Sequence, residues 1–149
     1  MKIVLMNMVK IYNKEANEVL VLDKVKKYGW EGLTFPGGKV ESYESFEDSV
    51  IREAKEETNL DIKNPKLVGI ITWITDTSKD VGLIYETTDF EGELVKENRE
   101  GTLSWMDYEE FKNIPDKSMS MDKILAIYDG KYREVFWDLR EGKNEIQYF

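Results

Sequence analysis

Three glutamates near the middle of the chain are the residues best suited to chemistry. Glu53, Glu56 and Glu57 recur at the three- and four-residue spacings that place side chains on one side of a helix. Like charges at that spacing repel, and a carboxylate beside buried surface loses hydration. A divalent cation would offset both effects. The alternative is a solvated acidic face that forms ion pairs with Arg52 or Lys55.

The segment that carries these glutamates has the end signals of a helix over residues 45–58. Ser45 followed by Asp48 is similar to a capping box, and Asn59 readily takes the left-handed conformation that ends helices. At about 100° per residue, Glu53 and Glu57 lie beside the apolar stripe of the helix rather than opposite it. The stripe consists of Phe46, Val50 and Ala54. The acids are therefore expected at the edge of buried surface.

The composition restricts the kind of metal that these acids could bind. The chain contains no cysteine and no histidine, which excludes disulfides, thiolate ligands, imidazole ligands and an imidazole base. A metal must then be held by oxygen atoms, which favours the hard cations magnesium and manganese. The expected cofactor is Mg²⁺ or Mn²⁺.

Length and charge restrict the class of protein. With 149 residues, the chain is long enough to bury a core, so residues 1–149 are expected to form a single domain. We find neither a membrane-length apolar run nor a signal peptide, and expect a cytoplasmic protein without a membrane partner. The net charge of −9 disfavours stable nucleic-acid binding, but a nucleotide neutralised by metal can still approach. The oligomeric state stays open.

Local patterns predict the other elements of the chain. Residues 2–12 form a nearly continuous apolar run, which suits a strand covered on both faces. Trp73 and Tyr85 are expected to pack in the core or on the sheet. Further strands are predicted over residues 18–25, 67–75, 81–88, 102–106, 133–139 and 145–149, with loops or turns at 61–65, 76–80, 89–101 and 141–144 and helices over 107–111 and from 118 or 120 to 130.

The spacing around the glutamates matches a known motif. Gly38 is followed after five residues by Glu44 and after seven more by the run REAKEETNL over residues 52–60. This pattern resembles the Nudix box of the Nudix hydrolases, and every charged position agrees with it. Ala54 is a small occupant of an apolar position, and Asn59 stands where the family prefers glycine. Asparagine tolerates positive φ, so the helix end is preserved.

The resemblance implies a fold and a set of ligands. The fold would be the Nudix fold, an α+β architecture (α/β/α sandwich) with a mixed β-sheet between helices and the box as a loop, a helix and a loop. The segment over residues 30–40 is also similar to the MutT-like, 8-oxo-dGTP diphosphatase group. The metal ligands implied are the Gly37 carbonyl and the side chains of Glu53, Glu56, Glu57 and Glu100, with Glu97 as the fallback for Glu100.

Catalytic roles are implied by the same resemblance. Because histidine is absent, the general base must be a carboxylate or a hydroxide held by the metal. In MutT-like enzymes the first glutamate after the arginine often serves, which makes Glu53 the expected base. Arg52 and Glu44 are expected to orient the ligating carboxylates.

Lysines near the box are the expected substrate contacts. Lys24 ends a predicted strand at the place where MutT-like enzymes have a basic residue, and Lys26 and Lys27 follow it. Lys39 lies directly after the two glycines and is a second expected substrate-binding residue. The alternative for these lysines is a role in surface solubility.

The activity implied is a magnesium-dependent pyrophosphohydrolase that converts a nucleoside triphosphate to the monophosphate and pyrophosphate. Other nucleoside diphosphates linked to a further group are possible substrates, and 8-oxo-dGTP is the favoured one. The residues that distinguish ADP-ribose hydrolases and dinucleoside polyphosphate hydrolases within the family are absent. Thr75 stands where the first group has proline, and residues 76–78 contain no tyrosine, which the second group has there. Two alternatives are a non-catalytic nucleotide-sensing Nudix domain and an RNA 5′-end pyrophosphohydrolase, which the acidic composition disfavours.

Overall fold

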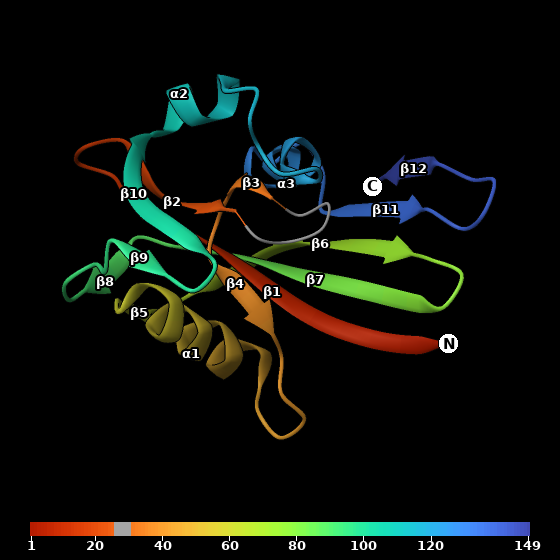
Figure 1. Ribbon diagram of the computed structural model, residues 1–149, viewed down its shortest axis with the longest axis horizontal. Helices are drawn as coiled ribbons and strands as arrows, with labels where there is room; N and C mark the ends of the chain where they lie inside the picture. Colours follow the sequence, from red (N-terminus) through yellow and green to blue (C-terminus); the bar gives the residue numbers. More distant parts are fainter. Residues whose placement is uncertain (26–30) are drawn as a thin grey trace.

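The protein is built around a large mixed β-sheet, seen edge-on in Figure 1. The computed structural model describes residues 1–25 and 31–149. In spatial order the sheet contains β12 (Glu145–Tyr148), β11 (Glu134–Asp138), β6 (Lys66–Ile74), β7 (Ser78–Thr87), β1 (Lys2–Asn13), β2 (Glu18–Lys24), β10 (Gly101–Asp107) and β9 (Glu97–Asn98). Short strands join it at two places: β3 (Gly32–Thr34) pairs with β2 and β4 (Gly37–Lys39) pairs with β1.

The central strand β1 explains why the sheet is mixed. It runs parallel to β7 but antiparallel to β2 and β4, and β11 runs parallel to β6. The predicted cover on both faces of β1 holds for its second half, where Val9 and Ile11 are fully buried. The first residues of the strand are exposed.

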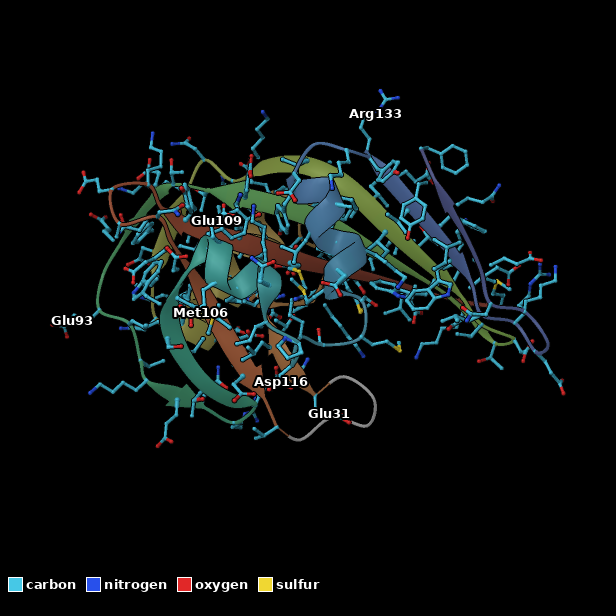
Figure 2. The ribbon with its side chains drawn as sticks, turned by 90° about the horizontal axis from the view of Figure 1, so that it is seen from above. Glu31, Glu93, Met106, Glu109, Asp116 and Arg133 are labelled. Carbon is cyan, nitrogen blue, oxygen red and sulfur yellow. The ribbon has the colours of Figure 1, made fainter. Side chains whose placement is uncertain are left out.

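Helices cover both faces of the sheet. On one side α1 (Phe46–Thr58) packs Val50 and Ala54 into one hydrophobic cluster. On the other side α2 (Tyr108–Asn113) and α3 (Met121–Tyr128) supply Phe111 and Ile124 to a second cluster. Figure 2 looks onto this second side, with α2 and α3 lying over the strands. The predicted α+β fold with a mixed sheet between helices is confirmed. None of the described helices is both long and apolar enough to cross a membrane.

The ends of α1 form as the sequence predicts. The Ser45 hydroxyl accepts a hydrogen bond from the Asp48 N–H at 3.0 Å, and Asn59 adopts a left-handed φ of 67°. The expected burial of Phe46 is wrong, because 44% of this residue is exposed. Ser49 takes the buried position in the first turn instead, where the Asn7 side chain donates a hydrogen bond to it.

The remaining elements agree with the predictions except at one turn and in two predicted loops. Both predicted hairpins form, β6 with β7 and β11 with β12, and the Asp107 carboxylate caps α2. The turn predicted at residues 76–80 is shorter, because Ser78–Thr87 is already strand. The predicted loops at 61–65 and 89–101 contain β5 (Asp61–Lys63), β8 (Asp89–Glu91) and β9, and β5 pairs with β8 in a separate small sheet. Local patterns do not reveal the pairing of β5 with β8, because the two strands are about 26 residues apart.

Candidate active site

Arg52 on α1 is the centre of a hydrogen-bond network. Its guanidinium donates to both carboxylate oxygens of Glu44, at 3.0 Å from Nε and 2.7 Å from Nη2. The Nη1 group donates to Glu53 at 2.9 Å and to Glu56 at 3.1 Å, and Nη2 also donates to the Lys39 carbonyl at 3.0 Å. One side chain therefore ties the loop before α1 to the helix and to two of its glutamates.

The paired fork between Arg52 and Glu44 has an electrostatic consequence. The hydrogen bonds from the Arg52 guanidinium, helped by the Glu41 N–H, lower the pKa of Glu44 to about 2. The same contact raises the pKa of Arg52 above its usual value. Glu44 is therefore ionised at neutral pH and holds Arg52 in one orientation.

Glu57 lies deeper than the other two glutamates of the helix. Burial, followed by the negative charges of Glu100 and Glu53, raises the pKa of Glu57 to about 8. Its carboxylate accepts a hydrogen bond from the Gly37 N–H at 3.4 Å. Burial also raises the pKa of Glu53, although Arg52 opposes that shift. Several carboxylates thus lie close together, and burial outweighs the nearby cations at Glu53 and Glu57.

That place is a cleft of about 500 Å³ between α1, β4 and the end of the loop before β10. Lys24 lies on its wall, 3.7 Å from the Glu100 carboxylate. The lining residues are Met6, Lys24, Gly37, Gly38, Lys39, Glu53, Glu56, Glu57, Asn98, Arg99 and Glu100. The cleft combines acidic side chains with cations, which suits a metal and a phosphate chain.

The two glycines of β4 are required by close packing. A Cβ atom on Gly38 would lie 2.2 Å from the carboxyl carbon of Glu53, and one on Gly37 would lie 2.1 Å from the Asn7 carbonyl oxygen. The backbone of Asn7 leaves no room for a side chain at Gly37, and a side chain at Gly38 would push the Glu53 carboxyl group aside. The glycines therefore let β4 approach both β1 and the glutamate of α1.

A smaller apolar cavity of about 140 Å³ adjoins the cleft. It lies on the side of the sheet covered by α3, and its wall includes Met8, Phe35, Trp73, Ile84, Ser120 and Ile124. The Trp73 indole N–H donates to the Ser120 hydroxyl at 3.1 Å, which fixes both side chains. Met6, Lys24, Gly37, Gly38 and Glu100 line both spaces. A ligand with a charged part and a flat apolar part could occupy the two together.

The sequence comparison decides the family. The NUDIX domain family matches residues 2–127, which is most of the chain. The chain belongs to the Nudix family. Nudix hydrolases cut phosphoanhydride bonds in nucleoside diphosphate derivatives, and they generally use a divalent metal.

Two curated Nudix relatives are similar over part of their length. The uncharacterized Nudix hydrolase YvcI of Bacillus subtilis is 38% identical over 104 residues, which cover 66% of this chain and 64% of YvcI. The NAD-capped RNA hydrolase NudC of Mannheimia succiniciproducens is 36% identical over 95 residues, covering 61% of this chain and 34% of NudC. The match spans less than two thirds of either relative.

Solved Nudix structures share the whole fold. The MutT protein of Bacillus halodurans superimposes with a TM-score of 0.75 at 26% identity, covering 97% of this chain and 96% of that one. The MutT protein of Methanosarcina mazei gives 0.72 at 20% identity, with 87% and 95% covered. The NUDIX domain of Shewanella oneidensis NrtR, solved with ADP ribose, gives 0.69 at 12% identity, with 88% of each chain covered. The last two comparisons concern the fold alone.

The donor set of the cleft fits the divalent metal of Nudix hydrolases. It offers carboxylate and backbone oxygens, and the raised pKa of Glu57 reflects burial and neighbouring negative charge, both of which a cation would offset. Within residues 1–25 and 31–149, no three acidic side chains are close enough to hold a metal ion as they stand. Glu53 and Glu56 both point to Arg52 in this arrangement, so these two carboxylates would have to turn.

The Nudix cleft brings together most of the residues predicted from the sequence. Arg52 and Glu44 are outside the lining: Arg52 donates to Glu53 and Glu56, and Glu44 accepts from Arg52. Glu100 lines the cleft, whereas Glu97 pairs with Thr102 at the exposed sheet edge. Lys26, Lys27 and Trp30 lie outside the described residues. The roles of all these side chains remain predictions.

Sequence reasoning missed several residues of the Nudix site. Asn98 and Arg99 line the cleft, but they lie in a stretch that reads as a charged loop. Trp73 and Tyr85 are both buried as predicted, yet only Trp73 lines the apolar cavity. Ser120 was expected only to start a helix. No local signal identifies these residues, because the cavity is assembled from distant strands and α3.

Proposed function

We propose that this Nudix protein is a metal-dependent pyrophosphohydrolase that converts a nucleoside triphosphate to the monophosphate and pyrophosphate. The observation that carries the proposal is the convergence of Glu53, Glu57 and Glu100 on one cleft whose wall also bears Lys24 and Lys39. We also propose that residues 1–149 act as one domain, since β11 and β12 extend the same sheet. A cytoplasmic location, which would give access to free nucleotides, is part of the same proposal.

The metal would be Mg²⁺ or Mn²⁺. Glu53, Glu56, Glu57 and Glu100, with the Gly37 carbonyl, would hold it. When bound, the metal lowers the pKa of water and offsets charge on the phosphate oxygens. The ligands are hard oxygen atoms, in keeping with these two ions.

The protein's own residues would orient the reactants. Water adds across the phosphoanhydride bond: its oxygen bonds to phosphorus, the bridging P–O bond breaks, and the bridging oxygen leaves with the departing phosphate group. Glu53 takes the proton of the water, which its burial and raised pKa favour. Arg52, held by Glu44, orients Glu53. Lys24 and Lys39 bind the phosphates.

The apolar cavity is the proposed position of the nucleobase. Phe35 and Trp73 on its wall offer ring surfaces, and the cavity opens into the cleft through shared lining residues. The similarity to MutT-like enzymes favours 8-oxo-dGTP among the triphosphates. Other nucleoside diphosphate derivatives remain within the proposed class, as for the NrtR domain solved with ADP ribose.

A substrate panel tests the proposal. Canonical and oxidised nucleoside triphosphates are incubated with Mg²⁺, and pyrophosphate release is measured for wild type, E53Q and the control E93Q. Glu93 projects from the surface in Figure 2. We expect turnover by wild type and E93Q, a loss of about 10²- to 10⁴-fold in E53Q, and no turnover in excess chelator. Undiminished turnover in E53Q or in chelator would refute the mechanism.

The similarity to NudC supports a second substrate class. NAD-capped RNA and 5′-triphosphorylated RNA therefore belong in the same panel, although the net charge of −9 disfavours a polyanion. Faster cleavage of either RNA than of any free nucleotide would replace the proposed substrate. Nucleotide binding with no hydrolysis of any compound would make the protein a sensor.

A further inference from the structure

Asn98 joins the loop that carries Glu100 to the last turn of α1. Its Nδ2 group donates to the Glu57 carbonyl at 2.9 Å, between residues 41 positions apart. Its Oδ1 atom accepts from the N–H groups of Glu100 at 2.8 Å and Gly101 at 3.1 Å. Both ends of the amide are therefore used, one on the helix and the other on the loop.

Asn7 makes the corresponding connection on the other side of the cleft. It is 5% exposed, and its Nδ2 group donates to the Ser49 hydroxyl in the first turn of α1 at 2.9 Å. Its Oδ1 atom accepts from the Gly38 N–H at 3.1 Å. The Ser49 hydroxyl in turn donates to the Phe46 carbonyl at 2.7 Å. Asn7 thus links β1, β4 and the start of α1.

An amide is the side chain that suits both places. It offers a donor and an acceptor at fixed separation, whereas an ionised carboxylate only accepts and an aliphatic side chain does neither. The bonds of Asn7 to Ser49 and Gly38 and of Asn98 to Glu57 reach across 31 to 42 positions of sequence, so they fix tertiary placement. The bonds of Asn98 to Glu100 and Gly101 are local and fix the turn that carries Glu100. Loss of one of these hydrogen bonds would leave a partly buried backbone or hydroxyl group without that partner.

We infer that Asn7 and Asn98 are positioning residues, which hold the Gly37–Gly38 backbone and Glu100 at their places around the glutamates of α1. The inference rests on the proposed function, in which these groups bind a divalent metal. Without Asn98, the turn between β9 and β10 that carries Glu100 would lose its hydrogen-bonded link to the last turn of α1. Without Asn7, β4 would keep its pairing to β1 but lose its link to the helix.

The test measures Mn²⁺ binding without nucleotide. Free Mn²⁺ is titrated by electron paramagnetic resonance with wild type, N98L and N7L, at a temperature where thermal melts show each variant to be folded. Leucine has a similar shape but can neither donate nor accept. We expect Kd to rise about 10- to 100-fold in each variant. The matched control is N113L, because the Asn113 amide donates to the Glu109 carbonyl within α2, on its exposed side and away from the cleft.

A double-mutant cycle separates positioning from general stabilisation. If Asn98 acts through Glu100, N98L should weaken Mn²⁺ binding little further in an E100Q background. Full additivity, or a wild-type Kd in N98L, would overturn the role of Asn98. If N7L does not fold, S49A removes the acceptor of the Asn7 amide and is measured in its place. A wild-type Kd in that variant would overturn the role of Asn7.

The outcomes distinguish this inference from the proposed function. Wild-type protein that binds no Mn²⁺ would overturn the proposed function and the positioning roles together. Wild-type binding that is lost in E57Q but unchanged in N98L and N7L would leave the proposed function intact and overturn the inference alone. A fall in the Tm of N98L or N7L without a change in its Kd for Mn²⁺ would likewise overturn the inference alone.

Discussion

At the scale of single residues, Glu57 combines burial with neighbouring negative charge. It is a carboxylate in a partly buried place, beside Glu100 and Glu53, and its pKa is raised to about 8. An ionised group in such surroundings destabilises the fold unless a cation accompanies it. The residue that suits metal binding is therefore a source of instability in the metal-free protein.

This effect predicts a pH dependence of stability. Between the ordinary pKa of 4.5 and the folded-state value of about 8, the folded protein keeps a proton that the unfolded chain has released. The free energy of unfolding must then fall as pH rises. We expect the Tm of metal-free wild type to fall by several degrees more than that of E57Q from about pH 5 to about pH 8, since ~1 kcal/mol corresponds to about 3 °C.

Thermal melts of wild type, E57Q and E93Q at a series of pH values provide the measurement. Saturating Mg²⁺ should reduce the difference between wild type and E57Q above neutral pH. Glu44 does not interfere, because its lowered pKa removes stability only as pH falls from 4.5 towards about 2. Parallel pH profiles for wild type and E57Q would contradict the burial of the Glu57 charge.

At the scale of elements, α1 is held at its ends by caps and along its side by Arg52. The caps depend on residues of the helix and its flanks, whereas Arg52 connects the helix to the loop that follows β4. The Glu44 contact uses the planar fork of the guanidinium, which a lysine ammonium does not reproduce. The Arg52 side chain thus joins the loop of the Nudix box to its helix.

The substitution R52K tests that connection. Lysine keeps the charge but loses the two-point contact with Glu44 and part of the contacts with Glu53 and Glu56. We expect the free energy of unfolding to fall by about 2 kcal/mol, and Mn²⁺ affinity to fall with it. Urea unfolding and the Mn²⁺ titration measure the two effects. R133K is the control, since Arg133 projects from the surface in Figure 2; an unchanged urea midpoint in R52K would contradict the network.

At the scale of the whole molecule, the sheet places two different spaces side by side. The cleft collects acids from α1 and from the segment before β10, and the apolar cavity lies under α3. The parallel pairing of β1 with β7 aligns Met6 with Gly82 and Met8 with Ile84 on the wall of that cavity. Phosphate chemistry and base binding would therefore be separable by mutation.

The substitution I124F tests this separation. Ile124 is 2% exposed and lines the apolar cavity, so a larger ring should fill space proposed for the base. We expect KM for the best nucleotide to rise about 10-fold, which corresponds to ~1.4 kcal/mol, with the Kd for Mn²⁺ unchanged. L125F is the matched control, because Leu125 is buried on the same helix but does not line the cavity. An unchanged KM in I124F would place the base elsewhere.

Much of the local structure follows from the sequence alone. Ser45, Asp48 and Asn59 determine the ends of α1, because caps depend on residues within a few positions of each other. The spacing from Gly38 to Leu60 identified the family through the charged positions of the box. The sequence alone therefore predicts the glutamates, Arg52 and the glycines as residues of the site.

How these parts meet depends on contacts that the linear pattern does not contain. The strand β4, the small sheet of β5 with β8, and the placement of Glu100 rather than Glu97 in the cleft depend on contacts between distant segments. The amide bonds of Asn7 and Asn98 and the Trp73–Ser120 contact have the same origin. Caps and helix faces are set by short-range geometry, but the burial of a charge and the shape of a cavity depend on which strands become neighbours.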